Sequence, residues 1–141
     1  MGRVNRFEDL EAWKLARELT ADIYGITSNE KFAQDFGLLN QICRASVSIT
    51  LNIAEGFERD GDKEFANFLS LAKGSVGEVR SQLYIAKDPN YINENQFFET
   101  YKKTQHVARL LANLIGYLRR SNVGGTKFLE KQAKSDGRAV K

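Results

Sequence analysis

Residues 48–60 read SITLNIAEGFERD, and this stretch decides how the chain folds. Ile49 and Ile53 are four residues apart, which is the spacing of one face of an α-helix. The polar Asn52 and the acidic Glu55 interrupt this otherwise apolar run, and a glycine follows at once. We therefore predict a helix that carries a polar line on the shoulder of its apolar face.

Three further segments have the same helical spacing of apolar residues. The four predicted helices cover about 8–28, 35–57, 62–87 and 93–120. The breaks between them are short, with Asp35 and Asp62 as expected N-caps and the only proline, Pro89, in the last break. No segment alternates as a strand does. The prediction is an all-α, antiparallel up-and-down four-helix bundle over residues 1–120, followed by a basic, mobile tail over residues 121–141.

Composition indicates one globular domain in a reducing compartment. The chain has 141 residues, and its single cysteine, Cys43, excludes an intrachain disulfide. The N-terminal residues lack the apolar segment of a signal peptide, and no apolar run is long enough to cross a bilayer. We expect a cytoplasmic protein without a membrane partner.

Charge is distributed unevenly along the chain. Residues 1–101 hold 11 Lys or Arg and 16 Asp or Glu, whereas residues 102–141 hold 10 and 2. A basic C-terminal end predicts an anionic partner such as RNA or DNA, although a solvated tail that only aids solubility gives the same pattern. The candidate nucleic-acid contacts are Lys102, Arg109, Arg119, Arg120, Lys127, Lys131 and Lys134.

The second and third predicted helices carry a second face opposite their core stripes. That face is apolar on the second helix, and it is made of small residues, with two glycines, on the third. Each helical glycine costs about 1 kcal/mol relative to alanine, so a close approach of another backbone is the simplest reason for them. The candidate contacts in a homo-oligomer are Val47, Leu51, Ala54, Ser70, Gly74, Gly77 and Ser81. Alternatively, the first helix covers the apolar face of the second helix, and the face of small residues on the third helix is exposed to solvent.

Polar residues form a line between these two faces. The expected polar network consists of Gln41, Arg44, Ser48, Asn52, Glu55, Ser75 and Glu78. Such a network between packed helices fixes their register. The alternative is an acid–base pair made by Glu55 and Glu78.

Other common chemistries lack their residues. One histidine and one cysteine are too few for a di-iron site or a Cys/His zinc site, and no phosphate-binding loop motif is present. We therefore predict a non-enzymatic protein with no cofactor and no metal site. Its expected role is weakly sequence-specific RNA or DNA binding, and the alternative is a protein-interaction scaffold that binds no nucleic acid.

Residues 7–118 resemble the bacterial four helix bundle protein family, first noted as reading frames in intervening sequences of 23S rRNA genes. The motifs that carry the resemblance are QICRA at 41–45, SI at 48–49, NIAEG at 52–56 and GSVGE at 74–78. The resemblance implies a homopentamer, and it implies kinship with the accessory proteins of diversity-generating retroelements. Those proteins are basic pentamers that bind nucleic acid and a reverse transcriptase. This chain differs from them in its acidic body.

Overall fold

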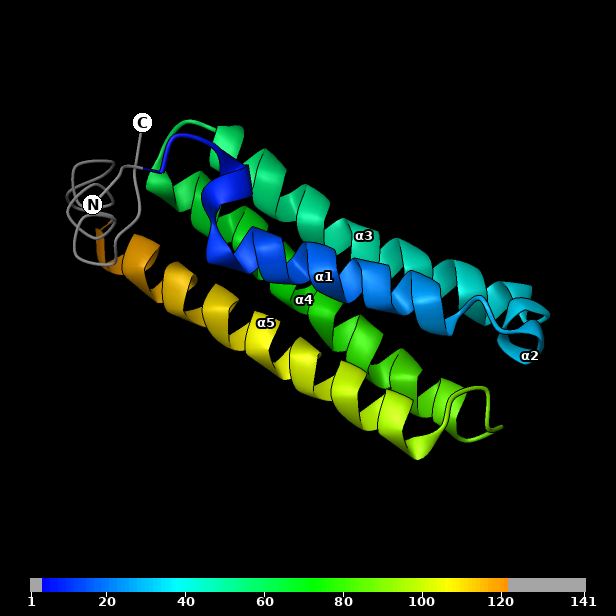
Figure 1. Ribbon diagram of the computed structural model, residues 1–141. Coiled ribbons are helices and arrows are strands. Elements are labelled where there is room, and N and C mark those ends of the chain that lie inside the picture. The colour runs from blue at the N-terminus through cyan, green and yellow to red at the C-terminus, as the bar shows by residue number, and fades with distance from the viewer. Residues whose placement is uncertain (1–3, 122–141) are drawn as a thin grey trace.

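The computed structural model describes residues 4–121, which form helices and no β-strand. Its elements are the 3-10 turn η1 (Phe7–Asp9) and the helices α1 (Glu11–Ile26), α2 (Glu30–Ala33), α3 (Phe36–Glu58), α4 (Asp62–Lys87) and α5 (Glu94–Arg120). The four long helices lie side by side as a bundle, with α2 at one end (Figure 1). Both α1 and α4 pack against α3 and α5, so the α1–α5 side of the bundle is opposite the α3–α4 side.

Helix boundaries follow the capping residues of the sequence. The carboxylate of Asp35 accepts the amide of Leu38, and Asn93 forms a capping box with Gln96. The expectation for Asp62 is wrong, because Gly61 is the N-cap, with a positive φ of 94°, and Asp62 is the first residue of α4. Only glycine adopts that φ without strain, so the chain turns at Gly61 and the aspartate enters the helix.

The first predicted helix is shorter in the structure. Its first turn is the separate element η1, and α1 begins at Glu11. The break predicted after it holds the one-turn helix α2, whose Phe32 is fully buried and whose N-cap is Asn29. Such short helices carry too few residues to show a helical period in the sequence.

The core lies between the four long helices, and the predicted apolar stripes line it. On α3 the stripe residues Ile42, Ala45, Ile49 and Ile53 are buried, while Leu38 is half-buried. The buried residues of α4 include Phe65, Leu69, Ala72, Val76, Val79, Leu83 and Ala86. Burial of this apolar surface is the main force that stabilises the bundle.

Gly56 explains part of the NIAEG motif. A Cβ at this position would lie 2.6 Å from the Cβ of Phe68 and 3.1 Å from Cδ1 of Phe65. No real Cβ approaches another atom so closely, so only glycine allows α3 and α4 to cross at this distance.

The bundle extends one residue beyond the predicted boundary. Ser121 is fully buried, and its Oγ lies 2.8 Å from Oδ2 of Asp62, which joins the end of α5 to the start of α4. The rest of the predicted tail, with Lys127, Lys131 and Lys134, lies outside the described residues. Among the helices of residues 4–121, none combines the length and the apolar character needed to cross a membrane.

Candidate nucleic-acid interface and polar network

The polar line of α3 meets α4 through two contacts. Ser75, which is buried, donates to Oγ of Ser48 across 3.1 Å, and Asn52 donates to both the Oγ and the carbonyl oxygen of Ser48. About two helical turns away on both helices, Gln82 donates to Gln41 across 3.4 Å. Of the predicted network, the structure brings Ser48, Asn52 and Ser75 together in one cluster between α3 and α4.

The charged members of the predicted network lie outside this contact. Arg44 and Glu78 are exposed, and Glu55 forms an ion pair of 2.9 Å with Arg59 rather than with a residue of α4. Arg59 also lies 3.8 Å from Glu64 and stacks over the ring of Phe68. Arg59 is not part of the predicted network, although its spacing of four residues from Glu55 is that of a helical ion pair.

Glu55 and Glu78 do not form a pair within one chain. The contact of Ser48 with Ser75 fixes which residues of the two antiparallel helices lie opposite each other. Glu78, three residues after Ser75, therefore lies opposite residue 45 of α3. Residue 45 is ten residues from Glu55, so the two carboxylates are about 15 Å apart along the bundle. Two carboxylates at this separation do not act on one bond, so the single chain offers no geometry for the acid–base alternative.

The outward surface of α3 and α4, here called the α3–α4 face, exposes apolar side chains. Leu51 and Leu71 are 61% and 59% exposed. The contact of Ser48 with Ser75 brings these two leucines to the same level, because the helices are antiparallel. A Cβ added to Gly74 or to Gly77 would meet no atom of the chain within 4 Å. Nothing in the described chain therefore requires either glycine.

The remaining candidate interface residues lie on or beside this face. Val47 and Ala54 are half-buried, and Ser81 is exposed. Ser70 is half-buried on the side of α4 near α5, where it accepts a hydrogen bond of 3.2 Å from Arg119.

The candidate nucleic-acid contacts on α5 divide into two groups. Lys102, Arg109 and Arg120 are exposed on the outward side of the helix. Lys102 lies 3.5 Å from Glu99, and the guanidinium of Arg120 stacks over Tyr117. Arg119 turns toward α4 instead and donates to Ser70. No acidic residue occurs on α5 after Glu99, so its outward side carries one sign of charge for the last 21 residues of the helix.

A shallow depression of about 320 Å³ lies between α1 and α5 beside these cations. Its lining residues are Leu15, Glu99, Lys102, Lys103, Gln105, His106 and Arg109. Lys103 forms an ion pair of 2.7 Å with Asp22 of α1 and lies 3.9 Å from Glu18. Lys103 therefore holds α1 to α5 and adds little free charge to the depression. Within residues 4–121, no cluster of His, Cys, Asp and Glu side chains is suited to a metal ion.

An aromatic cluster near the connection of α4 to α5 was missed from the sequence. Tyr84 contacts Phe97 and Tyr101, with ring centroids 4.9 and 5.7 Å apart. Phe98, which is 59% exposed, lies under Nζ of Lys102. The spacing of four residues between Phe98 and Lys102 was the signal that could have identified the pair. A hydrogen bond to Tyr101, together with burial, raises the pKa of the Tyr84 phenol.

Comparison with known proteins agrees with this architecture. The model of one protein family, described as 23S rRNA-intervening sequence protein, matches residues 8–113. The chain belongs to this family. The matched region runs from η1 into α5 and includes the polar network and the α3–α4 face.

A solved structure of similar fold supports the assignment of the family fold. It is a protein of unknown function from the S23 ribosomal protein family of Bacteroides thetaiotaomicron. It has 24% sequence identity and a TM-score of 0.68, and the match covers 74% of this chain and 97% of the other. A search of curated proteins gives no match.

Proposed function

We propose that this family member is a non-enzymatic, self-associating protein that binds RNA or DNA on the outward side of α5. The observation that carries the proposal is the absence of acidic residues on α5 after Glu99, beside exposed Lys102, Arg109 and Arg120. Outward sides of bundle helices usually mix both signs of charge. A surface of one sign attracts a phosphate backbone without reading its sequence.

Binding of this kind depends on the charges of the surface rather than on their detailed geometry. Several copies of the surface in one assembly add their fields and hold longer strands. We therefore expect weak sequence specificity and a steep loss of affinity with salt. The tail lysines Lys127, Lys131 and Lys134 remain part of the proposal as additional phosphate contacts.

The α3–α4 face supports self-association. Leu51 and Leu71 expose apolar area at one level, and Gly74 and Gly77 leave room for another backbone to approach. This face lies away from the α1–α5 side, so association through it leaves the outward side of α5 accessible. The resemblance implies five copies, and we include that number in the proposal.

A second function, a scaffold for another protein, draws support from the same apolar face. The resemblance suggests a reverse transcriptase as one such partner. In that case the α3–α4 face receives a different chain, and α5 contributes only solubility. If the protein binds nucleic acid, its retention on a phosphate-bearing polymer depends on the positive charge of α5. If it is a protein scaffold, that charge has no effect on retention.

Charge reversal tests the proposed function. The variant Arg109→Glu/Arg120→Glu removes two exposed cations without touching the core, and Lys14→Glu is a control on the exposed surface of α1. Fluorescence anisotropy with a labelled RNA and a labelled DNA should show at least tenfold weaker binding for the double variant, because two phosphate contacts are lost and two negative charges replace them. Lys14→Glu should bind almost as the unchanged protein does. Equal binding by all three proteins would reject α5 as the site.

A further inference from the structure

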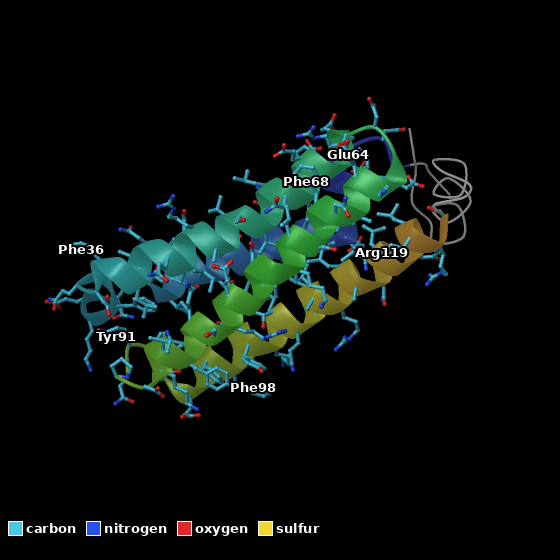
Figure 2. The ribbon with its side chains drawn as sticks, turned by 180° about the vertical axis from the view of Figure 1, so that it is seen from behind. Phe36, Glu64, Phe68, Tyr91, Phe98 and Arg119 are labelled. Atoms are coloured by element: carbon cyan, nitrogen blue, oxygen red, sulfur yellow. The ribbon has the colours of Figure 1, made fainter. Side chains whose placement is uncertain are left out.

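The aromatic cluster at the connection of α4 to α5 forms an exposed surface of its own, here called the aromatic platform. Its rings in mutual contact are those of Tyr84 of α4 and of Phe97 and Tyr101 of α5. Phe98 follows Phe97 on α5 and adds the ring that lies under Lys102 (Figure 2 labels Phe98). Phe97 and Tyr101 are half-buried against the core. Tyr84 and Phe98 are 48% and 59% exposed, so their rings reach solvent.

Single exposed aromatic rings are common on protein surfaces and require no ligand. The aromatic platform differs because cations surround it. Nζ of Lys87 lies 4.6 Å from the ring centroid of Phe97, and Nζ of Lys102 lies 5.1 Å from that of Phe98. Arg80 is close enough to Tyr84 to lower the pKa of its phenol, against the stronger effect of Tyr101.

Exposed rings beside cations match the chemistry of an unpaired nucleotide. A base stacks on an aromatic ring, and its phosphate pairs with a nearby lysine or arginine. A duplex keeps its base faces stacked inside and offers only phosphates and groove edges. We propose that the aromatic platform binds unpaired bases, and that the nucleic acid held by this protein is single-stranded RNA or DNA. This inference rests on the proposed function.

The platform is continuous with the basic side of α5, because Lys102 belongs to both. From Phe98 to Arg120 the helix extends 22 residues, or about 33 Å. A single strand stacked on Phe98 can therefore continue past Arg109 toward Arg120, where α5 carries no acidic residue after Glu99.

Two acids lie next to the platform. Glu94 is 3.3 Å from Lys87, and Glu99 is 3.5 Å from Lys102. Exposed ion pairs of this type contribute little free energy. Phosphate groups can replace both carboxylates as partners, and salt then screens the repulsion between the displaced acids and the strand.

The test compares one sequence as a single strand and as a duplex. Binding of a labelled 12-nucleotide DNA, and of its annealed duplex, is measured by anisotropy at one low salt concentration. The unchanged protein should prefer the single strand. The variant Phe98→Leu should lose about tenfold in affinity for the single strand, which corresponds to one stacked base, and should bind the duplex unchanged. The control Phe36→Leu alters a ring that is 71% exposed on α3 and should bind both forms as before.

The outcomes separate this inference from the proposed function. Equal affinity for both forms, with no effect of Phe98→Leu, would overturn the platform and leave binding through α5 intact. Equal losses in Phe98→Leu and Phe36→Leu would also overturn it, because the effect would not be specific to the platform. If Phe98→Leu changed only the assembly size in analytical ultracentrifugation, the face would be a protein contact. Failure of both nucleic acids to bind would reject the proposed function itself.

Discussion

Replacement of Gly56 by alanine tests how closely α3 and α4 approach. Alanine stabilises a helix interior by about 1 kcal/mol relative to glycine. The added methyl group, however, would lie 2.6 Å from Cβ of Phe68 and 3.1 Å from the ring of Phe65. The atom of Phe68 belongs to the root of the side chain, so it moves only with the backbone of α4. Overpacking of a core costs about 1 to 3 kcal/mol, and this contact is at the upper end.

The net effect of Gly56→Ala is therefore a loss of about 1 to 2 kcal/mol in the free energy of unfolding. For a chain of this size, that loss corresponds to a fall of about 4 to 8 °C in the melting temperature. Thermal unfolding followed by circular dichroism measures it, with all proteins at one concentration because self-association adds stability.

Gly25→Ala, in α1 and away from the α3–α4 face, is the matched control. The added methyl group meets no atom of the chain within 4 Å, so this variant should gain up to about 1 kcal/mol from helix propensity within the isolated chain. The two variants thus make the same chemical change, but the free energy of unfolding should fall in the first and rise in the second. A Gly56→Ala protein as stable as the unchanged one would refute the close crossing of α3 and α4.

Three further predictions concern the buried polar groups and the exposed leucines. Ser75→Val removes the hydrogen bond to Ser48 and leaves that hydroxyl with its bond from Asn52 alone, so urea unfolding should show a loss of about 1 kcal/mol, whereas equal stability would contradict a structural role for the contact. Leu51→Glu should shift sedimentation toward smaller species with the helix content retained, and an unchanged assembly would exclude the α3–α4 face as the contact. Burial raises the pKa of Asp62, with the hydrogen bond from Ser121 opposing it. The folded state then holds this proton more tightly than the unfolded state, so the unchanged protein should lose stability as pH rises above about 4, and Asp62→Asn should reduce that loss in denaturation measured across pH.

The sequence predicts the long helices well because their apolar periodicity extends over four turns or more. It also predicts Asp35 and Asn93 as helix starts, because their caps are local. Asp62 shows the limit of this reasoning. Its role depends on Ser121, which is 59 residues away, and on the positive φ of Gly61, and neither follows from local spacing.

The polar network shows the same limit at the level of side chains. Helical spacing puts Ser48 and Asn52 on one side of α3 and Ser75 on the corresponding side of α4, and the three side chains do meet. The four-residue spacing of Glu55 and Arg59 was the signal for their ion pair, but the predicted network directed Glu55 toward α4 instead. The aromatic platform was missed because its rings come from two helices that only the fold brings together.

The salt dependence of nucleic-acid binding tests the central claim most directly. The affinity of the full chain for a single-stranded RNA is measured at several salt concentrations. The logarithm of the binding constant is then plotted against the logarithm of the salt concentration. The account predicts a straight line whose slope corresponds to several phosphate contacts, and a clearly shallower slope for Arg109→Glu/Arg120→Glu. No binding at low salt, or one slope shared by both proteins, would contradict the assignment of α5 as the nucleic-acid interface.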